Sequence, residues 1–247
     1  MKRSEDAEVV LRPKIPSPNQ KSELSLGGRP KSLAEKVYEA IRQAIIAGTI
    51  EPGERVTENS LAERLSVSKT PVREALLELR RVGLIVDWGR RGGQVITPSR
   101  EAFQEVSETR EAIEVLVSAN AARRASEAEK RAIVQAAKNS LKVAKSGDIS
   151  GFHEANVIFH TLIADCARNS RMSSMLRDLF DLGSLLRLRD LPPIHDLVKY
   201  GEDHVAIAQR IAEGDAEGAA EAAREHVVHT RRENLEAFDR RNAASAE

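Results

Sequence analysis

Six long segments with the spacing of amphipathic helices follow one another through the C-terminal part of the chain. Only short breaks separate them, and glycine, asparagine, aspartate or proline residues in these breaks can end one helix and cap the next. Because short connections make neighbouring long helices antiparallel, this part of the sequence predicts an all-α helical bundle. The segments expected to be helical are 100–125, 127–146, 150–168, 171–190, 196–213 and 215–240.

The composition supports a mainly α fold. The 247 residues are 41% hydrophobic but only 3% aromatic, so the core must consist of Leu, Ile, Val and Ala, which makes an all-β fold unfavourable. The single cysteine, Cys166, cannot form a disulfide within the chain, and we therefore expect a reducing, cytoplasmic location. The longest stretch without a charged residue, 155–164, is about half of what a bilayer crossing needs, so no membrane span is expected.

The N-terminal part begins without a regular pattern. Residues 1–31 contain four prolines and no sustained hydrophobic period, which predicts a flexible arm. From Leu33 onwards hydrophobic residues recur every four positions, as in an amphipathic helix. Gly48 and the turn at 51–53 end this pattern.

Two short helical patterns joined by a three-residue turn occupy residues 58–82. In the second, Thr70 can act as the N-cap, and Pro71 suits the first helical position because its missing N–H would be unpaired there. Lys69, Thr70 and Arg73 then lie at the exposed start of that helix. A recognition helix presents side chains to base edges and phosphates from this position, so the pattern predicts a helix-turn-helix.

Residues 84–97 predict a strand, a glycine-rich turn and a second strand. The turn contains Arg90, Arg91, Gly92 and Gly93, which combine positive charge with close backbone approach. This combination is typical of a wing that lies against the phosphate backbone or the minor groove.

At these residues the chain resembles the GntR family of bacterial transcriptional regulators. The most specific matches are Ile-Ala-Gly-Thr-Ile-Glu-Pro-Gly at 46–53 and Ser-Lys-Thr-Pro-Val-Arg-Glu-Ala-Leu at 68–76. The resemblance implies a winged helix-turn-helix over 32–99 that binds double-stranded DNA. The expected DNA contacts are Asn59, Lys69, Thr70 and Arg73 with the wing residues Arg91, Gly92 and Gly93. Lys69 stands where arginine is common, and lysine lacks the bidentate fork that reads guanine.

Histidines on the inward faces of three predicted helices can converge inside the bundle. His204 and His226 are 22 positions apart with Asp215 midway, so their imidazoles come level if the two helices fold back there. Asn156 and His160 are four apart and share a helix face. Three imidazoles and an amide oxygen suit Zn, Ni or another divalent ion, although each histidine taken alone is more commonly an ordinary buried or surface residue.

The C-terminal half resembles the ligand-binding domain of the FadR subfamily, the FCD domain, which is an antiparallel all-α bundle. The matching segments are Asn-Val-Ile-Phe-His at 156–160, Glu-Asp-His at 202–204 and Glu-His-Val at 225–227. Many members hold a metal with three histidines and an aspartate or asparagine, which implies Asn156, His160, His204 and His226 as ligands here. Asn156 replaces the commoner aspartate, which removes a charge and should weaken metal affinity.

Arg110 lies on the apolar stripe of the first bundle helix. A buried guanidinium needs an anion, because an unpaired buried charge is strongly unfavourable. The sequence leaves two alternatives open. Glu114, one turn later, can pair with Arg110, or Arg110 can bind the carboxylate of a small effector, as in similar proteins.

Taken together, these patterns predict a DNA-binding protein with a ligand-binding bundle, and the two resemblances imply a homodimeric regulator of a palindromic operator, most commonly a repressor that a small organic acid releases. Residues 100–240 would form the effector-binding and dimerisation domain, and 241–247 a disordered tail. The alternatives are a metal-dependent hydrolase or lyase, and a constitutive DNA-binding protein with a structural bundle.

The net charge of zero conceals an uneven distribution, because residues 100–247 carry 21 basic and 25 acidic side chains.

Overall fold

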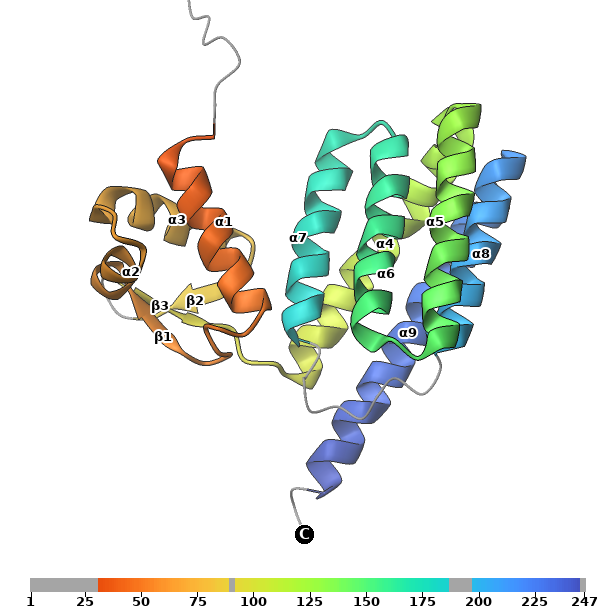
Figure 1. The fold of residues 1–247 in the computed structure, drawn as a ribbon. Helices are drawn as coiled ribbons and strands as arrows, with labels where there is room; N and C mark the ends of the chain where they lie inside the picture. Colours follow the sequence, from red (N-terminus) through yellow and green to blue (C-terminus); the bar gives the residue numbers. More distant parts are fainter. Residues whose placement is uncertain (1–30, 89–91, 187–196, 245–247) are drawn as a thin grey trace, which may run out of the picture. The chain divides into compact units, whose positions relative to one another are not determined.

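The computed structural model describes residues 31–88, 92–186 and 197–244, and the predicted N-terminal arm lies almost wholly outside them. The first part of the chain has three helices and three short strands (Figure 1). Their bounds are α1 Leu33–Ile46, β1 Arg55–Thr57, α2 Glu58–Leu65, α3 Lys69–Arg81, β2 Ile85–Asp87 and β3 Gly92–Val95.

The three strands form an antiparallel sheet in the order β1-β3-β2, with Val56 opposite Gly93 in one pair and Val86 opposite Gln94 in the other. The sequence did not predict β1, because three residues are too few to show an alternating pattern. Gly92 lies in β3 rather than in the predicted turn, as does Gly93. A Cβ at Gly93 would lie 2.2 Å from Ile85 Cγ2, so this glycine permits close packing within the sheet.

Helices α2 and α3, which correspond to the predicted helix-turn-helix, begin with different caps. Thr57 caps α2 by accepting a hydrogen bond from the Ser60 amide (3.1 Å). Helix α3 follows Ser68 and starts at Lys69, so the prediction that Thr70 is the N-cap is wrong. Pro71 is consequently the third helical residue, and it is tolerated because amides of the first turn lack an intrahelical partner.

Within the described residues, six helices form the bundle, and their positions confirm the predicted mainly α fold (Figure 1). The last helix continues past residue 240, where we expected a disordered tail to begin. No glycine or proline interrupts the chain there, and alanine favours helix. The bounds are α4 Arg100–Arg124, α5 Glu127–Ser146, α6 Ile149–Cys166, α7 Ser170–Leu186, α8 Leu197–Glu213 and α9 Ala216–Ala244.

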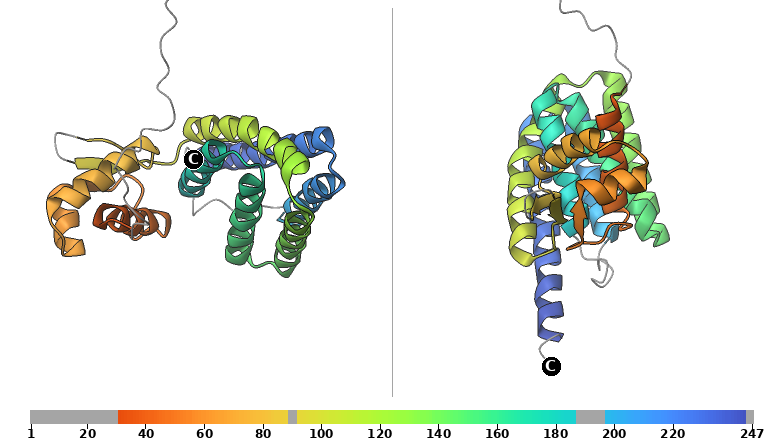
Figure 2. Two further views of the ribbon diagram at one scale, coloured as in Figure 1. Left: turned by 90° about the horizontal axis from the view of Figure 1, so that it is seen from above. Right: turned by 90° about the vertical axis from the view of Figure 1, so that its left-hand side faces the viewer.

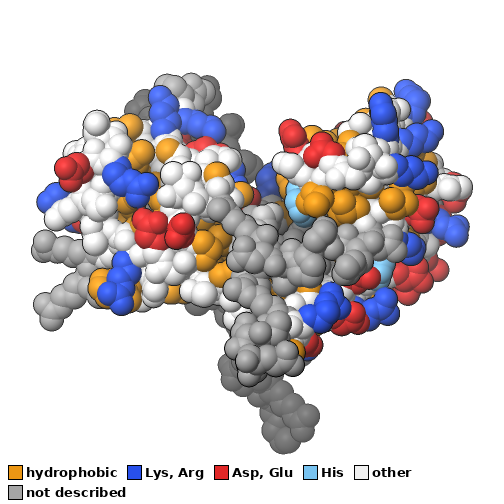
Figure 3. Space-filling model, turned by 60° about the horizontal axis from the view of Figure 1, so that its bottom comes forward, with side chains coloured by type: hydrophobic (Ala, Val, Ile, Leu, Met, Phe, Trp, Pro, Cys, Tyr) orange, Lys and Arg blue, Asp and Glu red, His pale blue; other side chains and the backbone are white. Residues whose placement is uncertain are grey.

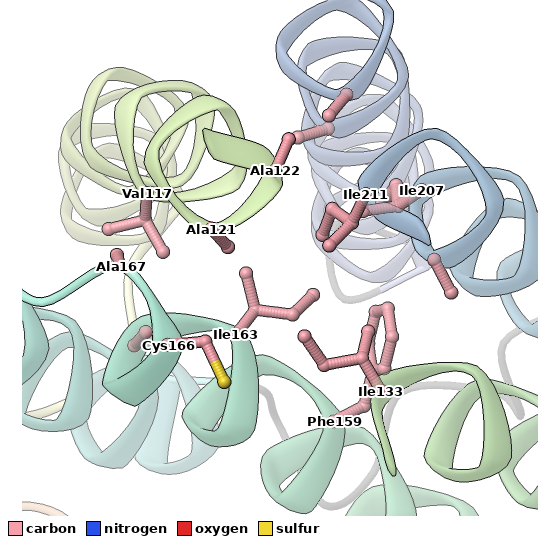
Figure 4. Close-up of a cluster of buried hydrophobic side chains, with 14 of the residues drawn as sticks. Val117, Ala121, Ala122, Ile133, Phe159, Ile163, Cys166, Ala167, Ile207 and Ile211 are labelled. Carbon is pink, nitrogen blue, oxygen red and sulfur yellow. The ribbon is translucent and has the colours of Figure 1, made fainter. Parts of the chain in front are cut away.

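Within the bundle, α4 lies beside α9 and α5 beside α8, which can be followed in the left view of Figure 2. Figure 4 shows the buried hydrophobic core between them, to which Val117 of α4, Ile133 of α5, Phe159 and Ile163 of α6 and Ile211 of α8 contribute. Lys and Arg side chains lie near Asp and Glu side chains on the face seen in Figure 3. None of the helices in the described ranges is both long and apolar enough to cross a membrane.

Candidate metal centre and nucleic-acid interface

Three histidines from three helices meet in the interior of the bundle. His160 lies on α6, His204 on α8 and His226 on α9, and each is at most 3% exposed. One ring nitrogen from each lies within 4.8 Å of those of the other two. The ring centroids of His204 and His226 are 4.8 Å apart, which confirms that the two helices bring these side chains level.

The connection between α8 and α9 sets this alignment. Gly214 has a φ of +76°, in the left-handed region that glycine adopts without a Cβ penalty, and it ends α8. The Asp215 carboxylate then accepts a hydrogen bond from the Gly218 amide (2.9 Å) in the first turn of α9. The two helices therefore run antiparallel after a very short connection, with the two histidines at equal distances from it.

Each imidazole has an oxygen atom beside its Nδ1. Glu114 Oε2 lies 2.8 Å from His160 Nδ1, and Ser140 Oγ lies 2.8 Å from His204 Nδ1. Asp203 Oδ2 is farther from His226 Nδ1, at 3.5 Å. A carboxylate can only accept, so Glu114 favours the tautomer of His160 whose Nδ1 donates and whose Nε2 carries the lone pair. The Ser140 hydroxyl can donate to or accept from His204, and Nδ1 of His226 makes no hydrogen bond within the described residues.

The Nε2 atoms of His160 and His204 are buried and have no hydrogen-bond partner within the described parts of the chain. Leaving a buried polar atom unpaired costs about 1–3 kcal/mol. Imidazole Nε2 atoms are common ligands of first-row divalent ions, so a metal held between these rings would satisfy both atoms. The residues present therefore fit the metal that the sequence predicts.

Burial and neighbouring charges shift the pKa values in this cluster. Burial lowers the pKa of His204 well below 6.5, with a further contribution from His226. Burial also lowers the pKa of His226, although the Asp203 carboxylate opposes this. Burial alone would raise the pKa of Glu114, but the positive charge of Arg110 and contact with His160 outweigh it and hold that pKa below its usual range. His204 and His226 are thus neutral near pH 7, as metal ligation requires.

Arg110 and Glu114 form a buried ion pair, one of the two alternatives that the sequence left open. Arg110 is 5% exposed, and its Nε donates to Glu114 Oε1 (2.9 Å). The guanidinium carbon also lies 4.5 Å from the centroid of the Phe180 ring. Because the second oxygen of Glu114 contacts His160, one carboxylate joins Arg110 to the histidine cluster.

Asn156 is 8% exposed and lies one turn before His160 on α6. A second polar group adjoins the cluster at His229, which no pattern in the sequence had indicated as a ligand. Its Nδ1 lies 3.5 Å from Asp203 Oδ2, and its Nε2 lies 3.5 Å from Glu233 Oε1. Asp203 therefore faces both His226 and His229, and these contacts between helices leave no periodic signal in the sequence.

The predicted DNA-contacting residues of α2 and α3 are all exposed, namely Asn59, Lys69, Thr70 and Arg73. Arg73 makes two hydrogen bonds to the carboxylate of Glu58, at 2.9 and 2.8 Å. No periodic pattern marks Glu58, because it lies on another helix, 15 positions before its partner. In the wing, Gly92 and Gly93 are buried in β3, and Arg91 lies outside the described residues.

Comparison with known proteins accounts for both parts of the chain. Residues 33–95 match the family described as bacterial regulatory proteins, gntR family, and residues 105–229 match the FCD domain. A "Probable D-xylose utilization operon transcriptional repressor" of Paenarthrobacter nicotinovorans is 31% identical over 206 residues, which cover 80% of this chain and 86% of its own. A protein of Escherichia coli (strain K12), provisionally named as an L-lactate dehydrogenase operon regulatory protein, is 28% identical and covers 88% of this chain and 92% of its own.

The solved structure of Escherichia coli McbR/YncC has the same fold, with a TM-score of 0.69 over 81% of this chain and 96% of its own, at 21% identity. The relatives are transcriptional regulators rather than enzymes, so the hydrolase or lyase alternative is not retained. This protein belongs to the GntR family of bacterial regulatory proteins, as a DNA-binding transcriptional regulator of the FadR-like subfamily with an FCD domain.

Proposed function

We propose that the protein is a ligand-responsive repressor that acts as a homodimer in the cytoplasm. In this proposal each winged helix binds one half-site of a palindromic operator, because the two-fold symmetry of a dimer matches that of a palindrome. The base and phosphate contacts would come from Asn59, Lys69, Thr70, Arg73 and Arg91, whereas Gly92 and Gly93, which are buried in β3, would support the wing without contacting DNA. Residues 100–240 would bind the effector and dimerise.

The observation that carries the regulatory part of the proposal is the convergence of His160, His204 and His226 with two Nε2 atoms unpaired. These imidazoles would hold a divalent ion such as Zn²⁺ or Ni²⁺, with the amide oxygen of Asn156 as a fourth ligand. When bound, the ion would supply a positive centre with a coordination position left for a ligand oxygen. Glu114 would keep the ring of His160 in the ligating orientation.

A small organic acid is the effector class that this arrangement favours. Arg110 is buried beside the histidine cluster, and its guanidinium has more donors than the bonds to Glu114 use. The name of the Escherichia coli relative refers to an L-lactate dehydrogenase operon, which supports a hydroxy acid. The acid would regulate DNA binding only through a difference in its affinity for the DNA-bound and the released conformations.

A DNA-binding titration tests this proposal. A duplex selected by the protein from a randomised pool would be titrated with hydroxy acids, sugar acids and dicarboxylates, before and after treatment with a chelator. We expect one class of acid to release the duplex and chelation to abolish that release. DNA affinity that no acid changes would instead support a constitutive DNA-binding protein, and an acid that tightens binding would overturn the proposal that the acid releases the operator.

A further inference from the structure

The exposed arginine of the recognition helix is held by an acidic residue of the preceding helix. Arg73 Nε donates to Glu58 Oε1 at 2.9 Å, and Arg73 Nη2 donates to Glu58 Oε2 at 2.8 Å. The Glu58 side chain is only 12% exposed, whereas that of Arg73 is 59% exposed. The two side chains thus form a parallel pair of hydrogen bonds whose acidic half is buried and whose basic half faces outward.

The position of this carboxylate is unfavourable for simple electrostatic binding of DNA. Asn59, the next residue on α2, and Lys69 on α3 are both exposed and predicted to contact DNA. A negative charge close to such residues repels phosphates and weakens sequence-independent affinity. Glu58 can therefore favour DNA binding only through the geometry that it imposes on Arg73.

The hydrogen bonds to Glu58 determine which donors of Arg73 are left. A guanidinium has five N–H donors, and this pairing uses the edge formed by Nε and Nη2. Both hydrogens of Nη1 and one of Nη2 are left at the outer end of the group. Two parallel N–H donors at this end match the O6 and N7 acceptors of guanine in the major groove. Lys69 cannot make such a bidentate contact.

We propose that Glu58 is a specificity-determining positioning residue, which fixes the guanidinium of Arg73 so that its outer end reads one guanine of the operator. This inference rests on the proposed role of Arg73 as a DNA contact. A carboxylate that acts in this way improves the discrimination between sequences while it lowers the affinity for DNA in general.

The experiment compares Glu58→Gln with Glu63→Gln, which removes the same charge from an exposed position on the same helix. Binding of the full-length variants would be measured by fluorescence anisotropy, with a duplex that the wild-type protein selects from a randomised pool and with a scrambled duplex. We expect Glu58→Gln to bind the selected duplex about ten-fold more weakly and the scrambled duplex at least as tightly as wild type. The control should change the affinities for both duplexes by the same factor.

A base-by-base scan identifies the origin of any loss. Glu58→Gln and Arg73→Ala should lose discrimination at the same base pair, and the double variant should lose no more than Arg73→Ala alone. The inference is overturned if Glu58→Gln binds both duplexes more tightly by the same factor, or if Arg73→Ala discriminates as wild type does. If Glu58→Gln does not fold, Glu58→Asp replaces it, because aspartate draws the carboxylate back by one methylene. This variant should lose part of the discrimination at that base pair. Wild-type discrimination in Glu58→Asp would contradict the inference. A wild-type protein that selects no duplex would instead contradict DNA binding itself.

Discussion

Glu114 contacts His160 with one carboxylate oxygen, Oε2, at 2.8 Å from Nδ1. Its other oxygen, Oε1, accepts a hydrogen bond from Arg110 Nε and forms an ion pair with Nη2 of the same residue. A single carboxylate therefore lies between the arginine on the apolar stripe of α4 and a proposed metal ligand. Replacing Glu114 by glutamine keeps the shape and removes the charge. We expect metal affinity to fall about 10- to 100-fold and the free energy of unfolding to fall as well, because Arg110 loses its buried anion.

A metal-indicator competition and urea unfolding would measure the two effects of Glu114→Gln. Glu105→Gln, at an exposed position on the same helix, serves as the control and should change neither. Wild-type metal affinity in Glu114→Gln would show that Glu114 does not orient His160.

Removing one imidazole should abolish metal binding. We expect the purified wild-type protein to contain about one divalent ion per chain and the His204→Ala variant to contain almost none, because two imidazoles and an amide are a weak site. Elemental analysis after dialysis without chelator measures this. His153→Ala, on α6 and outside the cluster, should retain the ion. A metal-free wild-type protein that folds and responds to its effector would refute the metal site.

Asn156→Asp should strengthen metal binding. The substitution introduces the carboxylate that is commoner in similar proteins, and a charged oxygen binds a divalent ion more tightly than an amide oxygen does. Competition with a chelator of known affinity measures the change, and unchanged affinity would show that position 156 does not contact the ion. Asn169→Asp, directly before α7, where the side chain accepts a hydrogen bond from the Met172 amide, introduces the same charge outside the cluster and should not change metal affinity.

Arg110→Ala should separate effector binding from DNA binding. We expect this variant to bind the selected duplex with wild-type affinity but to lose its response to the organic acid, because the acid's carboxylate loses its guanidinium partner. A DNA-binding titration with the acid measures both properties. A variant that still responds would leave Arg110 with only the structural pairing to Glu114.

The metal-free protein should become less stable as the pH falls below about 6.5. Since the pKa values of His204 and His226 are lower in the folded state than their unperturbed value of 6.5, the unfolded state binds more protons in this range. Their neutral forms therefore favour folding above pH 6.5, and this contribution is lost as the pH falls, by up to about 1.4 kcal/mol per pH unit for each residue. Urea unfolding in chelator at pH 7.5, 6.5 and 5.5 measures it, and the double variant His204→Gln/His226→Gln should have a flatter profile.

The sequence predicted the features that repeat along one helix or depend on one connection. The buried stripe of α4 with Arg110 on it and the alignment of His204 with His226 both follow from helical periodicity. Ser140 was not predictable in this way, because it lies 64 positions before His204 and approaches it only through the packing of α5 on α8. Glu58 was missed for the same reason, since its contact with Arg73 depends on how α2 and α3 cross.

The short α8–α9 connection also limits how this bundle can change in length. One residue added between Gly214 and His226 would rotate the imidazole of His226 by about 100° around its helix axis and away from His204. A change in length before His204 or after His226 leaves the spacing between these two histidines unchanged. Insertions and deletions between residues 204 and 226 should therefore be tolerated less well than those elsewhere in the bundle.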